Sequence, residues 1–267
     1  MNAGKFVPKL LTVGCWNIEG LFENINGTKI SKLEDEIFHD TIKKFDILCL
    51  QETHISNNTT FSKPKEFHTI THCRNKSANN RYFGGFLIFI RNSIWKGVKK
   101  SDNEDKDIFE LTLSKKYFGL DDDLKIIFTY ASPGGSCYVK TRSKHVIDSV
   151  EENLMNIDDG ECLIMGDLNG RTKLGEDFVR DENDKHSPIN SLSYIRDDVA
   201  PSRENMDRTP IDQQGKKILE FCKYSGYRIL NGRMNGDKSG KFTRYPRNAQ
   251  DSPSVIDYTL CSAPFLK

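Results

Sequence analysis

One short stretch, Glu161 to Gly170 (ECLIMGDLNG), constrains the fold more than any other part of the chain. Its apolar run ends at Gly166, and a short apolar run bounded by glycine is typical of a buried strand. Asp167 and Asn169 follow at once, two residues apart. Because side chains alternate along a strand, we expect both to point to one spot at its carboxyl end. A carboxylate and an amide there suit a hard cation or a phosphoryl group, although ordinary strand-to-loop turns also favour Asp and Asn.

Other apolar runs predict many strands and few helices. Strands are expected at residues 10–17, 46–51, 85–91, 109–113, 124–130, 228–230, 242–245 and 255–261. Helices are expected after the capping box Ser31–Glu34, over residues 138–155 and over residues 214–224, the first with Leu33, Ile37, Phe38 and Ile42 on its inward face. Residues 171–210 read as a long polar loop, a type that is usually functional or mobile. Without repeats or linkers, we expect a tail at residues 1–9 and a single domain over residues 10–267.

The composition suits a soluble globular protein, with 36% apolar and 29% charged residues among 267. A formal net charge of +1 excludes a strong field over the whole surface, so any phosphate recognition must be local. The chain has seven cysteines and no C-x-x-C pair, and four of them, Cys15, Cys49, Cys162 and Cys261, lie in apolar strand-like runs. We expect these four to be buried thiols in a reducing compartment and not a disulfide frame or zinc site, so we expect an intracellular protein. We find no signal peptide or long apolar span, and we expect no membrane partner.

Polar residues recur at strand ends, where packing gives no reason for them. They are Asn17 with Glu19, Glu52, Tyr130, Asp167 with Asn169, and Asp257. A buried carboxylate is costly unless it is paired or bound to a metal. Three of these residues, Glu52, Asp167 and Asp257, are carboxylates with no obvious lysine partner, which favours a shared Mg²⁺ or Mn²⁺ ion.

These segments, in the order WNIEG, LQETH, the Tyr130 strand, GDLN and SVIDY, resemble the endonuclease/exonuclease/phosphatase superfamily from about Leu10 to the end of the chain. Later segments, from LEFC through GYRILNG and GKFT to VIDY, look most like the apurinic-type endonuclease domain of non-long-terminal-repeat retrotransposons. The resemblance implies an α/β (α+β) fold, a four-layer sandwich of two packed, mostly antiparallel β-sheets flanked by helices. It also implies hydrolysis of a phosphate ester with Mg²⁺ (or Mn²⁺).

The resemblance assigns metal binding to three residues. Glu52 would be the main metal ligand, Asn17 would bind the metal or a phosphate oxygen, and Glu19 would stand near the metal. Ordinary structure offers alternatives, because Asn17 could be a turn residue and Glu19 an exposed loop residue.

The other roles concern water and phosphate. Asp167 would orient or deprotonate the attacking water, while Asn169 and Tyr130 would hold the phosphate. Relatives often read Tyr-x-Pro, whereas this chain reads Tyr-Ala-Ser-Pro133, so Tyr130 could instead be a core residue.

Asp257 would fix a catalytic histidine of a Ser-Asp-His motif that follows the SVIDY strand in the family. The chain ends at Lys267 before any such motif, so we expect a domain incomplete at its C-terminus. Its own activity is then in question, because a missing general acid–base typically costs ~10²–10⁴ in rate. His54, two residues after Glu52, is the candidate substitute.

We expect a Mg²⁺-dependent phosphodiesterase, a DNA endonuclease of retrotransposon type. Its partners would be the DNA backbone, through Arg171, Lys173 and Arg244, and a reverse transcriptase domain of the full gene product. We expect a monomer, located in the nucleus if it acts on genomic DNA. The alternatives are an inositol-phosphate phosphatase, a sphingomyelinase-like phospholipase, a deadenylase, or a catalytically dead fragment that binds nucleic acid or protein.

Overall fold

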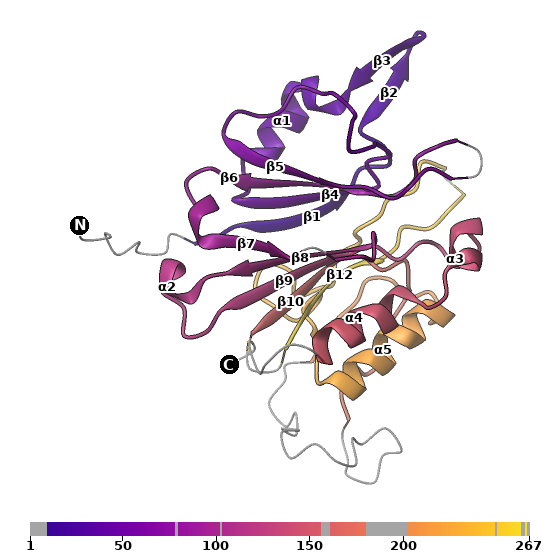
Figure 1. Cartoon of the computed structure of the whole chain (residues 1–267). Coiled ribbons are helices and arrows are strands. Elements are labelled where there is room, and N and C mark those ends of the chain that lie inside the picture. Colours follow the sequence, from indigo (N-terminus) through magenta and orange to yellow (C-terminus); the bar gives the residue numbers. More distant parts are fainter. Residues whose placement is uncertain are drawn as a thin grey trace. The chain divides into compact units, whose positions relative to one another are not determined.

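The computed structural model describes residues 10–77, 80–101, 103–155, 161–179, 202–248, 250–262 and 265. The chain divides into two compact units, an N-terminal unit, Met1–Tyr130, and a C-terminal unit, Ala131–Lys267. Figure 1 labels their helices and strands. The predicted tail and residues 180–201 of the predicted long loop lie outside the described residues.

A four-stranded sheet forms the first layer of the N-terminal unit. Its order is β1-β4-β6-β5, made of β1 (Val13–Asn17), β4 (Ile47–Gln51), β6 (Phe86–Arg91) and β5 (Phe67–His72). β1 runs parallel to β4, and the other two pairs are antiparallel. The fully buried apolar run of β4 explains its central place, because a strand covered on both faces needs no polar alternation.

Three antiparallel strands pack on one face of this sheet: β7 (Val98–Ser101), β8 (Ile108–Leu113) and β9 (Leu124–Thr129). The Gln51 amide on β4 donates to the Thr129 carbonyl on β9 at 2.8 Å. The rings of His72 and Phe109 lie 5.5 Å apart between β5 and β8. The unit is therefore built on two β-sheet layers in direct contact.

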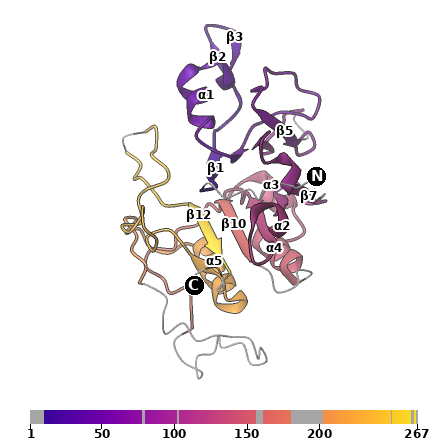
Figure 2. The ribbon, with the colours of Figure 1, turned by 90° about the vertical axis from the view of Figure 1, so that its left-hand side faces the viewer.

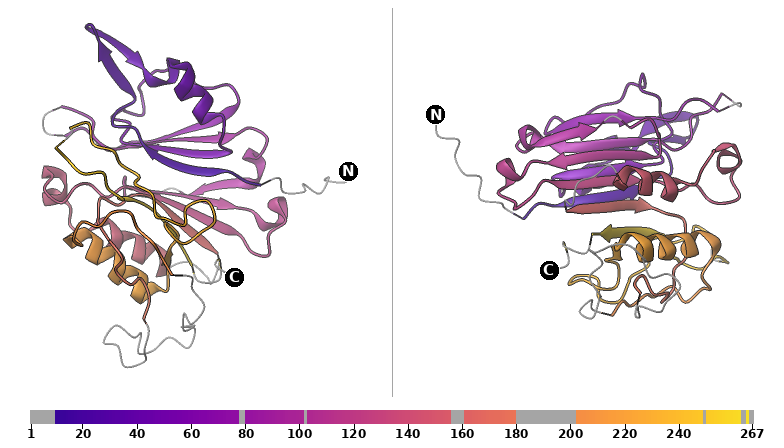
Figure 3. Two further views of the ribbon diagram at one scale, coloured as in Figure 1. Left: turned by 180° about the vertical axis from the view of Figure 1, so that it is seen from behind. Right: turned by 60° about the horizontal axis from the view of Figure 1, so that its bottom comes forward.

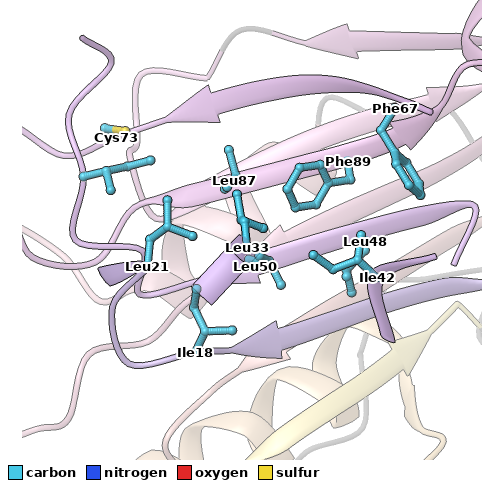
Figure 4. Packing of buried hydrophobic residues seen from close by; sticks show 11 residues of the cluster. Ile18, Leu21, Leu33, Ile42, Leu48, Leu50, Phe67, Cys73, Leu87 and Phe89 are labelled. Carbon is cyan, nitrogen blue, oxygen red and sulfur yellow. The ribbon is translucent and has the colours of Figure 1, made fainter. Parts of the chain in front are cut away.

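Helical segments cover the other face of the four-stranded sheet. They are the 3₁₀ turn η1 (Lys32–Glu34) and helix α1 (Glu36–Ile42). Figure 4 shows Leu33 and Ile42 from these segments beside Leu48 and Leu50 of β4 and Phe89 of β6. Burial of such side chains stabilises the layer by about 1.5–3 kcal/mol each relative to exposure.

A β-hairpin projects next to α1, as Figures 1 and 2 show. It pairs β2 (Phe22–Ile25) with β3 (Thr28–Ser31) through a two-residue turn, Asn26-Gly27. Both turn residues have positive φ, 52° and 83°. Positive φ at both positions is what a type I′ hairpin turn requires, and Asn-Gly is a favoured pair for it.

The C-terminal unit combines three strands with helices. β10 (Cys162–Asp167) and β11 (Arg228–Ile229) both pair antiparallel with β12 (Asp257–Cys261). Figure 3 shows α4 (Val146–Met155) and α5 (Gln213–Ser225) side by side in this unit. Helix α5 begins at the Asp212 cap and ends at Gly226, which has φ +75°. Short elements complete the fold: η2 (Trp95–Gly97), α2 (Lys115–Phe118) and α3 (Cys137–Thr141).

These elements confirm the predicted class, a mixed α/β fold with two β-sheets flanked by helices. Three local predictions were wrong. The helix expected over residues 138–155 is broken, because Arg142 is extended with ψ 140° between α3 and α4. The strand expected over residues 242–245 is only one bridge, Arg244 to Ser254. Ile37, expected to face inward, is 79% exposed, because α1 begins only at Glu36 and not at the Ser31 cap.

Three of the four cysteines expected to be buried are buried. Cys49, Cys162 and Cys261 are buried within strands, and Cys15 is partly exposed. In the described part of the chain, every helix falls short of the length or apolar character needed to traverse a bilayer.

Candidate functional site

The predicted site residues of the N-terminal unit gather where β1 and β4 end. The two strands are parallel and in register, with Asn17 opposite Gln51. Their carboxyl ends therefore lie at the same sheet edge, which brings Asn17 close to Glu52. Glu52 follows the strand with φ 52°, a left-handed backbone conformation that ends the extended chain.

The Glu52 carboxylate is surrounded by hydrogen-bond donors. The Tyr130 hydroxyl donates to its Oε1, and His54 Nε2 lies 3.5 Å from its Oε2. Burial acts to raise the pKa of Glu52, but hydrogen bonds from His54, Tyr130 and Asn17 outweigh it and lower the pKa. Glu52 is thus held as an anion at neutral pH. Tyr130 is buried, as expected if it were a core residue, but its hydroxyl donates to Glu52.

Backbone hydrogen bonds hold this strained segment on two sides. The amides of Gly20 and Leu21 donate to the carbonyls of Glu52 and Thr53 at 2.6 and 2.9 Å. The amide of His54 donates to the Gly84 carbonyl at 3.0 Å. A left-handed non-glycine residue persists only where its surroundings determine it, and these contacts supply that determination.

Asn17 and Glu19 differ in how firmly they are placed. Asn17 Oδ1 accepts the Glu19 amide at 3.0 Å, so the two residues form a tight Asx turn. The Glu19 side chain is exposed and its φ is 49°. This exposure suits the alternative of a loop glutamate as well as a position beside a metal.

Asp167 and Asp257 meet in the C-terminal unit. They are direct partners in the antiparallel β10–β12 ladder, so their side chains share a face. Asp167 is buried, and burial raises the pKa of Asp257, with a hydrogen bond from Thr243 acting in the opposite direction. Two like charges side by side attract a cation or share a proton. This pairing of two carboxylates therefore favours a bound cation or a proton at this position.

Asn169 does not continue the strand, so the expectation that it shares a strand face with Asp167 was wrong. β10 ends at Asp167, and Asn169 turns back with φ 47°. Its amide N–H donates to Asp167 Oδ1 at 2.9 Å, and its side-chain Nδ2 donates to the Ala131 carbonyl at 2.8 Å. Asn169 nevertheless lies beside Asp167, through a turn that the carboxylate itself stabilises.

The three predicted DNA-contacting residues differ in their surroundings. Arg171 Nη1 lies 2.7 Å from Asp207 Oδ2 and donates to Thr209 Oγ1 at 2.9 Å, so this guanidinium is bound within the protein. Lys173 and Arg244 are exposed. Their role in DNA binding stays a prediction.

Other residues near the site were missed by sequence reasoning. Arg74 and Asp107 form a buried pair against Tyr130. Asn231 Nδ2 donates to the Asp257 carbonyl at 3.1 Å, and its Oδ1 accepts the Thr259 amide at 3.0 Å. Arg74 and Asn231 lie in loops, so their position near the site is recognised only from their contacts in the structure.

The donors present suit a hard divalent ion. Glu52 and Asn17 offer a carboxylate and an amide oxygen, and Asp167 and Asp257 offer two carboxylates. Within the residues that the structure describes, no group of three or more His, Cys, Asp or Glu side chains could hold a metal. Mg²⁺ commonly uses only one or two carboxylates and keeps several waters, so the oxygen donors on each unit fit it.

Comparison with known proteins adds a family and a fold. Residues 14–267 match the profile of the endonuclease/exonuclease/phosphatase family. No curated protein sequence matches the chain.

Three solved structures illustrate the fold similarity. A family protein from Leptotrichia buccalis aligns with TM-score 0.55 and 11% identity, covering 94% of this chain and 87% of its own. An AP endonuclease from Archaeoglobus fulgidus aligns with TM-score 0.51 and 15% identity, covering 96% and 88%. The APE2 catalytic domain from Xenopus laevis aligns with TM-score 0.52 and 13% identity, covering 95% and 83%. At such identities the likeness concerns the fold alone.

Proposed function

The chain belongs to the endonuclease/exonuclease/phosphatase family, and on that basis we propose that it is a divalent-metal-dependent phosphodiesterase that nicks DNA. Members of this family are typically nucleases and phosphoesterases, and they generally use divalent metal ions, commonly Mg²⁺. We further propose the retrotransposon type, supported by the order of the late sequence segments from LEFC to VIDY.

The observation that carries the proposal is the environment of Glu52. Its carboxylate has a lowered pKa and lies among the side chains of Asn17, His54 and Tyr130. A rigidly held anion beside an amide oxygen is a natural ligand set for a hard cation. A carboxylate with a purely structural role would more simply pair with Arg or Lys, as Glu110 does with Lys125 at 3.9 Å.

Each residue then has a defined task. Glu52 and Asn17 would hold the divalent ion, which when bound would supply positive charge to the phosphate oxygens. Asp167 would orient the attacking water and accept its proton, and its buried position keeps that carboxylate fixed. Tyr130 and Asn169 would hydrogen-bond the phosphate in the transition state.

DNA is the proposed substrate, contacted through its phosphate backbone. The exposed Lys173 and Arg244 would contribute to this binding, and salt would weaken it. We propose that the chain acts as a monomer, in the nucleus where genomic DNA is the target, in association with a reverse transcriptase domain.

A plasmid-nicking assay tests the proposal. Purified chain is incubated with supercoiled plasmid in Mg²⁺ or in chelator, and nicked product is measured. The variants are Glu52→Gln and Asp167→Ala, with Glu110→Gln as the matched control. The Glu52 and Glu110 side chains are similarly shielded, 19% and 14% exposed, and both lie in the N-terminal unit.

We expect Mg²⁺-dependent nicking that Glu52→Gln and Asp167→Ala abolish and Glu110→Gln retains. Nicking that survives both site variants would refute the assignment. Salt-sensitive DNA binding without nicking would indicate a binding module instead. Hydrolysis of an inositol phosphate or a lipid in place of DNA would keep the phosphoesterase reaction and change the substrate.

A further inference from the structure

Arg74 and Asp107 form a buried ion pair in contact with Tyr130. Arg74 Nε donates to Asp107 Oδ1 at 2.5 Å, and the two side chains are 6% and 1% exposed. The Arg74 guanidinium lies over the Tyr130 ring, with Cζ 5.1 Å from the ring centroid. A guanidinium on an aromatic face is attracted to it, and more strongly when both are shielded from water. The pair therefore restrains the ring whose hydroxyl reaches Glu52.

Asp107 also restrains Tyr130 through the backbone. The Tyr130 amide donates to the Asp107 carbonyl at 3.0 Å, next to the β8–β9 pair Ile108 and Thr129. The Asp107 amide in turn donates to Asp105 Oδ1 at 3.0 Å. Tyr130 is thus fixed at its ring by one member of the ion pair and at its backbone by the other.

Gly84 connects the same guanidinium to the segment that follows Glu52. Its carbonyl accepts the His54 amide at 3.0 Å, and the Gly85 carbonyl accepts the Thr53 amide at 3.2 Å. A Cβ at Gly84 would lie 2.7 Å from Arg74 Cζ, so the missing side chain makes room for the guanidinium. Arg74 therefore contacts Tyr130 directly and approaches the Glu52 segment through Gly84.

From these contacts we propose that Arg74 and Asp107 are positioning residues that hold the Tyr130 hydroxyl against the Glu52 carboxylate. The inference rests on the proposed phosphodiesterase function and extends its machinery by one layer. The pair acts through Tyr130 and Gly84. Residues in such supporting layers typically change activity by about 10- to 100-fold when substituted.

A purely structural pair is the competing explanation, and the same unit offers a matched control. Arg91 Nε lies 3.1 Å from Asp46 Oδ1, and the Arg91 guanidinium lies over the Phe67 ring at 5.0 Å. Arg91 thus makes the same two interactions as Arg74, an ion pair with an aspartate and a contact with an aromatic ring. Its ring, Phe67, belongs to the hydrophobic core.

The first measurement reports on Tyr130 without any catalysis. The chain is labelled with 3-fluorotyrosine, and the Tyr130→Phe variant identifies the Tyr130 signal among nine tyrosines by ¹⁹F NMR. Arg74→Lys keeps the charge but loses the planar guanidinium. We expect Arg74→Lys and Asp107→Asn to shift the Tyr130 signal and Arg91→Lys to leave it in place.

The second measurement is a double-mutant cycle in the nicking assay. Arg74→Lys should lower kcat by about 10- to 100-fold with little change in KM. In a Tyr130→Phe background that loss should disappear, because the hydroxyl that Arg74 positions is gone. Arg91→Lys should leave kcat unchanged in both backgrounds.

An unmoved Tyr130 signal in both pair variants, or losses that multiply across the cycle, would overturn the inference. If Arg74→Lys and Asp107→Asn shift the Tyr130 signal but the wild-type chain does not nick DNA, the positioning pair is supported and the proposed function is refuted. Thermal unfolding identifies a variant that fails to fold. If Arg74→Lys fails to fold, Asp107→Asn, which retains the guanidinium, decides the question.

Discussion

Replacing Gly84 by alanine tests how tightly the Arg74 guanidinium is enclosed. Alanine at φ +63° incurs a backbone cost of about 1–2 kcal/mol, as any non-glycine residue does in that region. The new Cβ would also lie 2.7 Å from Arg74 Cζ. The guanidinium must therefore move away from its place beside Asp107, and such overpacking costs about 1–3 kcal/mol more.

Gly119→Ala isolates the backbone term. Gly119 has a similar φ of +71°, belongs to the same unit, and a Cβ there would meet nothing within 4 Å. We expect Gly119→Ala to lower the free energy of unfolding by about 1–2 kcal/mol. Gly84→Ala should lower it by about 2–5 kcal/mol, the sum of the two terms.

Urea unfolding of the three proteins measures both values, provided that the slope m stays the same. Equal destabilisation of the two variants, within about 0.5 kcal/mol, would show that Arg74 yields freely and would refute the close enclosure. The folded fraction of Gly84→Ala should also nick DNA more slowly than Gly119→Ala, because the displaced guanidinium no longer holds Tyr130.

Three more tests concern the Asp167–Asp257 pair, His145 just before α4, and two of the cysteines. Asp257→Asn should raise the free energy of unfolding, measured in urea with chelator present, by about 0.5–1 kcal/mol, because it removes a negative charge opposite Asp167. A lower free energy of unfolding would contradict this. Burial lowers the pKa of His145. The free energy of unfolding of the wild type should therefore fall as pH drops below about 6.5, the pKa of an unfolded histidine, because protonation then favours the unfolded chain. Unfolding measured between pH 8 and 5 should show a smaller fall for His145→Asn. Iodoacetamide should modify exposed Cys137 before Cys73, whose pKa burial raises to about 11, as peptide mass spectrometry can check.

Long apolar runs carried the predictable part of the fold. β4, β6, β8, β9 and β10 are each continuous and largely buried, so their sequences contain the information that fixes them. The strands expected from the sequence did not include the hairpin β2–β3, whose residues are mostly exposed. Its Asn26-Gly27 turn was nevertheless a readable signal, since that dipeptide favours two-residue hairpins.

The candidate site was predictable in its members and not in its geometry. Strand ends pointed to Glu52 and Asp167, and the parallel β1–β4 pair explains why Asn17 lies near Glu52. The turn at Asn169 was not readable, because the choice between a continued strand and an Asx turn depends on the acceptor that Asp167 offers. Arg74 was invisible for a different reason: its loop shows no periodicity, and its partner lies 33 residues away.

Backbone strain occurs at several of the predicted site residues. Non-glycine residues with positive φ include Glu19, Glu52, His54 and Asn169, all of them at or beside predicted site residues. Each such conformation costs about 1–3 kcal/mol and requires fixed surroundings. For Glu52 the surroundings are the carbonyl and amide contacts on both sides and the Tyr130 hydroxyl, so relaxing the segment would also release the carboxylate. The position of the proposed metal ligand therefore depends on the two loops that contain Gly20 and Gly84. A substitution in either loop should alter the site even though the substituted residue does not contact it.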